Sequence, residues 1–185
     1  MSMTNLEEMT KKEFLIFCLA ATFGGFMVGI GGVGLLISMV SFEGALGQLV
    51  GAIIFSLAMF VVTIFGLYLV TGLSTSIITM RKKNFWVLPI TFVFNVLGVA
   101  ISAVLVHFSH VEVNAIATAV MDTKLCDDGW VLHSLCSGVL CGILIGLSVF
   151  LSKYAAKKHL SATVGVIFPV FVFVFCGFDN SLANL

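Results

Sequence analysis

Long apolar segments separated by short polar ones dominate this sequence. A helix needs about 20 apolar residues to cross a bilayer, whereas membrane-spanning strands alternate with period two, and these apolar runs are uninterrupted. The pattern therefore predicts one all-α integral membrane domain over 1–185, with a short polar N-terminal end. Its expected spans are 14–40, 44–80, 84–108, 130–152 and 160–185.

Two of these spans are predicted to be broken helices. The segment 44–80 has 37 residues, well beyond what one crossing requires, and polar residues with a glycine suggest a break near 71–74. The last span meets a second polar stretch, with a break expected near 176–180. Ser74 and Asn180 are good helix N-caps, so each break is expected to start a half-helix whose positive end favours an anion.

The two breaks resemble each other in sequence. Residues 71–76 and 176–181 share the pattern Gly-[Leu/Phe]-x-x-Ser at an offset of 105 residues, and their spans run in opposite directions. Broken helices at matching positions of an inverted repeat indicate a solute site near the membrane midplane. At this offset about one span has no counterpart, which fits either a truncated chain or a natural short version.

Small residues are concentrated in the first span. Since glycine lets transmembrane backbones approach closely, we expect a helix-packing face there. A phosphate-binding glycine loop would instead need a preceding strand. The glycines of this span are Gly24, Gly25, Gly29, Gly31, Gly32 and Gly34.

Composition and charge narrow the function. The chain is 60% hydrophobic and 10% charged, against about 25% charged in soluble domains. A net charge of zero removes the electrostatic case for a nucleic-acid partner. Eight of the nine Lys and Arg residues fall on one side of the predicted spans. The positive-inside rule then predicts a multi-pass protein of the inner or plasma membrane with a cytoplasmic N-terminus.

Catalytic chemistry finds no support in the sequence. The five cysteines have no metal-ligand spacing, and no nucleophile or Walker motif is present. We therefore predict no enzyme activity, no metal and no cofactor. The expected partners are a small solute, membrane lipid and further copies of the chain.

Several motifs resemble those of the formate/nitrite transporter family. Residues 177–185, GFDNSLANL, are similar to the family's G-F-E-H-S-x-A-N-M, and residues 65–72 to its G-x-E-L-F-T-G-N. The pair Cys136 and Cys141 is similar to its C-N-W-L-V-C. The resemblance covers nearly the whole chain and implies an aquaporin-like bundle of six spans with an inverted repeat. It also implies a homopentamer in which each protomer has its own pore.

The resemblance carries residue roles with it. Phe55 and Met59 would line one constriction and Phe173 the other, although their spacing alone also fits ordinary helix packing. The first broken loop would comprise Leu69, Val70 and Thr71, and Asn180 would occupy the pore centre. Structural support of the pore loops would come from Asp179, Asn184, Ser181, Gly72 and Gly177.

Two departures from the family pattern matter. Asn180 replaces the family's central histidine and has no proton to exchange near neutral pH. Ala162 stands where the family has a lysine. The expected function is a passive or proton-coupled channel for small monovalent anions such as formate, nitrite or hydrosulfide. A pore for small neutral solutes and a non-conducting scaffold or fragment are the alternatives.

Overall fold

The computed structural model describes residues 9–75, 77, 80, 84–109, 118, 130–157 and 162–178. All regular structure in those residues is helical. Four of the helices are long and apolar enough to cross a membrane, namely α1, α2, α4 and the 131–152 part of α6. The helices are α1 (Lys11–Ser41), α2 (Ala45–Ile64), α3 (Val70–Ser74), α4 (Val87–Phe108), α6 (Trp130–Lys157) and α7 (Ala162–Phe175).

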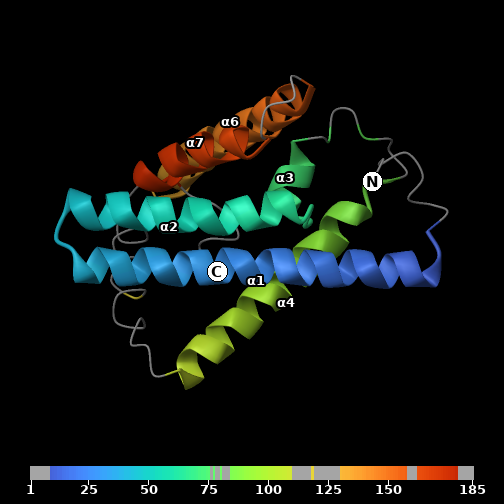
Figure 1. The fold of residues 1–185 in the computed structure, drawn as a ribbon, viewed down its shortest axis with the longest axis horizontal. Helices are drawn as coiled ribbons and strands as arrows, with labels where there is room; N and C mark the ends of the chain where they lie inside the picture. Colours follow the sequence, from blue (N-terminus) through green and yellow to red (C-terminus); the bar gives the residue numbers. More distant parts are fainter. Residues whose placement is uncertain are drawn as a thin grey trace.

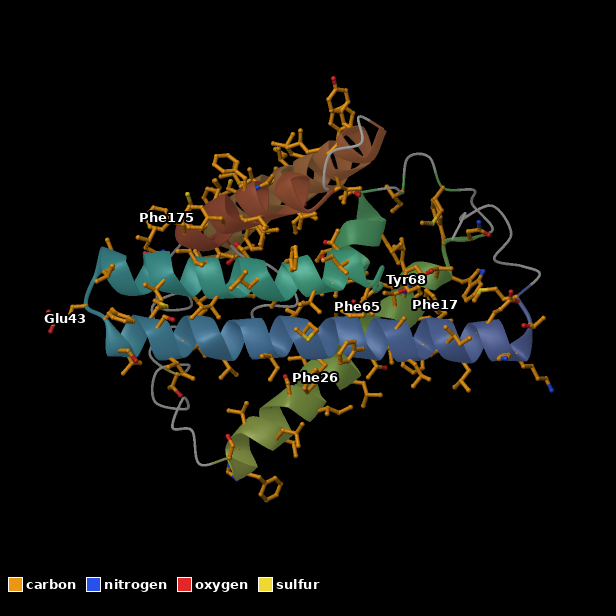
Figure 2. All side chains as sticks on the ribbon, in the orientation of Figure 1. Phe17, Phe26, Glu43, Phe65, Tyr68 and Phe175 are labelled. Carbon is orange, nitrogen blue, oxygen red and sulfur yellow. The ribbon has the colours of Figure 1, made fainter. Side chains whose placement is uncertain are left out.

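Helix α2 lies between α1 and the α6–α7 pair (Figure 1). Helix α1 runs alongside α2 and is crossed obliquely by α4, while α7 packs against both α2 and α6. The short α3 contacts α4 and α6. Helices α2 and α7 run in opposite directions, so Phe175 at the end of α7 lies beside the start of α2 (Figures 1 and 2). The ends of α2 and α7 therefore lie at opposite ends of the pair.

The outer surface of the bundle is apolar. Phe108, Leu132 and Phe168 are 74%, 67% and 69% exposed, and they are three of many large apolar side chains that face outward. Exposed apolar surface of this extent is typical of a protein that contacts lipid. Helix α7 has only 14 residues, about 21 Å at 1.5 Å per residue, which is short of a full crossing.

The helix α1 begins with a complete capping box. The Thr10 hydroxyl accepts a hydrogen bond from the Glu13 N–H at 3.3 Å, and the Glu13 carboxylate accepts one from the Thr10 N–H at 2.8 Å. The box satisfies backbone donors that a helix start leaves free. It fixes the beginning of α1 at Lys11, close to the predicted start of the first span at residue 14.

Glycines bring α1 against its neighbours, as the sequence predicts. A Cβ on Gly25 would collide with the backbone of Asn95 in α4, and one on Gly98 would collide with the backbone of α1. A Cβ on Gly24 would lie 2.8 Å from the Tyr68 carbonyl oxygen. Gly32 is the exception, because nothing lies within 4 Å of its Cβ position. These glycines of α1 therefore allow close backbone contact with α4 and with the residues that follow α2.

We expect Gly25→Ala to destabilise the protein. The added Cβ meets backbone atoms of Asn95 that cannot rotate away, and overpacking of this kind costs about 1–3 kcal/mol. Gly32→Ala is the matched control, because alanine gains up to about 1 kcal/mol over glycine in a helix when space is free. Thermal unfolding in detergent should show a lower Tm for the first variant only. Equal melting temperatures would contradict the close approach.

Candidate functional site

The first interruption of the backbone occupies residues 65–69, directly after α2. Gly66 has a φ of 60°, which favours glycine. Its N–H donates to the Thr63 carbonyl at 3.2 Å, and the Leu67 N–H donates to the Val62 carbonyl at 2.9 Å. These two bonds form a Schellman motif, which satisfies carbonyls at the end of α2. Leu69, the last residue before α3, has an extended backbone.

The side chain of Asn95 holds this extended segment in place. Asn95 lies in the middle of α4 and is fully buried. Its Oδ1 accepts a hydrogen bond from the Val70 N–H at 2.9 Å. Its Nδ2 donates to the Tyr68 carbonyl at 2.9 Å and to the Ala21 carbonyl of α1 at 2.7 Å. One amide therefore connects α1, α4 and the interruption, and replaces water as the partner of non-helical backbone.

The turn at residues 176–178, which ends α7 and is named here the second interruption, repeats the backbone geometry of the first. Helix α7 ends at Phe175, and Gly177 has a φ of 70°. The Gly177 N–H donates to the Val174 carbonyl at 3.0 Å, and the Phe178 N–H donates to the Phe173 carbonyl at 3.0 Å. This is the same Schellman pair as at Gly66. Two helices that run in opposite directions therefore end in the same way.

The structural repeat corrects the register inferred from the sequence. Gly177 matches Gly66, an offset of 111 residues, rather than Gly72 at 105. The predicted break at 71–74 is wrong, since Gly72 lies inside α3 and Ser74 is its last residue rather than an N-cap. The N-cap of α3 is Leu69, whose apolar side chain cannot accept a hydrogen bond. The Val70 N–H at the start of α3 instead donates to Oδ1 of Asn95 in α4.

Side chains predicted to line the pore gather in one apolar cluster. Phe55 and Phe173 are almost completely buried, with ring centroids 6.0 Å apart in an edge-to-face arrangement. They form one aromatic pair, whereas the sequence-based expectation places them in separate constrictions. Leu69 is buried in the same cluster, and Met59 and Val70 pack against it. The antiparallel packing of α2 and α7 produces this pair.

Both interruptions contribute to this central cluster. Leu67 and Leu69 enter it from the first interruption, and Phe173 and Phe178 enter it from around the second. Cys141 of α6 is also buried there. Two segments more than one hundred residues apart therefore contribute to the same apolar cluster, one at each of its ends.

The remaining predicted site residues fall in two groups. Thr71 and Gly72 are in α3, where their carbonyls accept hydrogen bonds from the hydroxyls of Ser74 and Thr75 at 2.8 and 2.7 Å. Gly177 forms the second turn. The predicted residues Asp179, Asn180, Ser181 and Asn184 lie outside the described residues.

Two residues that hold the site were missed by the sequence analysis. Asn95 is an uncharged amide in the middle of the apolar segment 84–108, and a polar residue at such a depth marks a functional or structural site. Gly66 lies in the family-like segment 65–72, but that motif does not by itself indicate a turn at this glycine. Because the partners of Asn95 lie 25 to 74 positions away along the chain, no local pattern reveals them.

Comparison with known proteins decides the family. The sequence model described as formate/nitrite transporter matches residues 2–185. The chain belongs to the formate/nitrite transporter family. The formate channel FocB of Escherichia coli (strain K12) is 25% identical over 192 residues, covering 96% of this chain and 67% of FocB. A solved structure described as an FNT family ion channel matches with a TM-score of 0.78 at 22% identity, covering 94% of this chain and 72% of that chain.

Membership of the formate/nitrite transporter family fixes the broad function. The family consists of channels and transporters for small anions, and this chain is a multi-pass member of it. The structural likeness adds a shared fold, which agrees with the predicted all-helical membrane bundle. The particular solute is a separate question.

We expect Asn95→Ala to disrupt the first interruption. The substitution leaves the Val70 N–H and two carbonyls without their partner, at about 1–3 kcal/mol for each buried group. Both the Tm in detergent and the anion flux in proteoliposomes should fall.

Thr91→Val serves as the matched control for this variant. Thr91 is fully buried one turn earlier on α4, and its hydroxyl donates only within its own helix, to the Val87 carbonyl at 2.7 Å. Its replacement should cost about 1 kcal/mol or less. A normal Tm and normal flux for Asn95→Ala would show that the amide does not hold the interruption.

Proposed function

We propose that this protein is a channel, passive or proton-coupled, for small monovalent anions of the formate, nitrite and hydrosulfide class. The observation that supports this most is that two Schellman turns, at the ends of α2 and α7, both contribute side chains to the central cluster around Phe55 and Phe173. Close-packed apolar side chains exclude water and form a gate that opens by local rearrangement. The likeness to a protein named as a formate channel supports formate as the first solute to test.

We extend the offset of 111 residues to the positions after Phe178 to propose roles for them. At an offset of 111, Asp179 corresponds to Tyr68 and Asn180 to Leu69. The Tyr68 ring packs 4.8 Å from that of Phe17, in the cluster between α1 and α4, whereas Leu69 enters the central cluster. By this correspondence Asp179 supports the loop and Asn180 contacts the solute.

The same register extends to the other predicted support residues. Ser181 corresponds to Val70, whose N–H is held by the Asn95 amide. Asn184 corresponds to Leu73, which is buried against the α1–α4 side. We assign both Ser181 and Asn184 to support of the second loop. Thr71 would supply a hydroxyl near the path from the first turn of α3.

A pore for small neutral solutes is the second candidate. An asparagine amide donates and accepts hydrogen bonds without changing its charge, so Asn180 suits a neutral solute as well as an anion. Flux of formate and of urea into proteoliposomes, each at pH 5.5 and pH 7.5, separates the two. Proton-linked anion flux rises as the pH falls, whereas neutral flux does not.

We expect Asn180→His to create pH-dependent anion flux. Histidine has an ordinary pKa near 6.5, so it gains a positive charge and a transferable proton as the pH falls through that range. Formate flux should therefore rise between pH 7.5 and 5.5 more steeply in the variant than in the wild type. Phe168→His is the control, since Phe168 is 69% exposed on the outer face of α7. Identical pH profiles for all three proteins would remove Asn180 from the path.

The assembly and orientation follow from the same proposal. We infer a homopentamer in the inner or plasma membrane with the N-terminus in the cytoplasm. The bias of cationic residues supports the orientation, and the apolar outer surface offers area for contacts between copies. Light scattering of the detergent-solubilised protein should give the mass of five chains. A monomeric or polydisperse species would instead favour the scaffold or fragment alternative.

A further inference from the structure

One polar side chain continues the buried face of α2 towards the second interruption. Ala52, Phe55, Met59 and Val62 follow one another at helical spacing, and all of them belong to or pack on the central cluster. Gln48 precedes Ala52 by four residues and so extends the same stripe. It is half-buried, in contrast to the fully buried Phe55.

The Gln48 amide lies against the turn that ends α7. A Cβ placed on Gly177 would lie 3.6 Å from Gln48 Nε2, so the amide is in contact distance of this turn. The antiparallel arrangement of α2 and α7 explains the contact, because Phe175 lies beside the start of α2 (Figure 2).

The position of Gln48 relative to the aromatic pair follows from helix geometry. Seven residues separate Gln48 from Phe55, about 10 Å along α2. Met59 and Val62, and beyond them the first interruption, lie on the other side of Phe55 along the helix. Gln48 therefore stands at the end of the central cluster that is remote from the first interruption.

We propose that Gln48 is a solute-contacting residue at one mouth of the path, and that it selects for small oxyanions before they pass Phe55 and Phe173. This inference rests on the proposed channel function. The Nε2 group donates two hydrogen bonds and Oε1 accepts, which matches a carboxylate or nitrite oxygen without adding a fixed charge. A neutral donor binds an anion weakly enough to release it, as conduction requires.

Charge substitution at Gln48 provides the test. Gln48→Lys should raise formate flux and Gln48→Glu should lower it, by roughly fivefold between the two variants at 10 mM salt. At 1 M salt, where the Debye length is about 3 Å, the difference should largely disappear. Urea flux should not separate the two variants at either salt concentration. A purely structural glutamine would instead give losses of the same sign in both variants, with no dependence on salt.

Controls make the outcome decisive. Leu49 is the next residue, 37% exposed and off the stripe, so Leu49→Lys and Leu49→Glu should conduct alike. Should a charged Gln48 variant fail to fold, Gln48→Met keeps the shape and should raise the half-saturating formate concentration at an unchanged Tm.

Two results would separate the two proposals. Wild-type protein that conducts no anion contradicts the proposed channel function itself. Wild-type conduction together with equal flux in Gln48→Lys and Gln48→Glu, or an unchanged half-saturating concentration in Gln48→Met, overturns the role of Gln48 alone.

Discussion

The hydrogen bonds of the Asn95 amide are the constraint on which the rest of this structure depends. Non-helical backbone at membrane depth survives only where protein groups replace water. Asn95 supplies that replacement at the end of the first interruption, on both sides of Leu69, by bonding to Tyr68 and Val70, and it also binds the Ala21 carbonyl of α1. The amide reaches all three because α4 crosses α1 at backbone contact, and only glycine at position 25 permits that distance. Helix packing and loop geometry therefore depend on each other.

The second interruption has the same backbone hydrogen bonds as the first. Gly66 and Gly177 close their helices with the same pair of backbone hydrogen bonds, although α2 and α7 run in opposite directions. The two turns lie at opposite ends of the α2–α7 pair, and the edge-to-face pair of Phe55 and Phe173 lies between them. The same backbone geometry thus recurs at both ends of one apolar cluster, with different side chains at each end.

Much of the architecture was predictable from the sequence, and the reasons are local. Span lengths and apolar composition gave helices whose ends agree with 84–108 and 130–152 to within a few residues, and clustered glycines predicted the packing face of α1. That α2 and α7 end close to polar, glycine-containing stretches was also predictable. The register of the two turns was not, because a short shared motif favoured Gly72, whereas the turn forms at Gly66, where Leu67 finds the Val62 carbonyl. The contact between Phe55 and Phe173 was equally hidden, since it arises from the antiparallel packing of distant helices.

The three hydrogen bonds of the Asn95 amide affect how the proposed channel would open. Moving the first interruption would break several buried hydrogen bonds together, each leaving a group whose desolvation costs about 1–3 kcal/mol. Rotation of an aromatic ring between staggered side-chain conformations breaks none of them. The backbone around residues 65–69 is thus held firmly in place, and in the proposed channel reorientation of Phe55 and Phe173 is the less costly way to admit an ion.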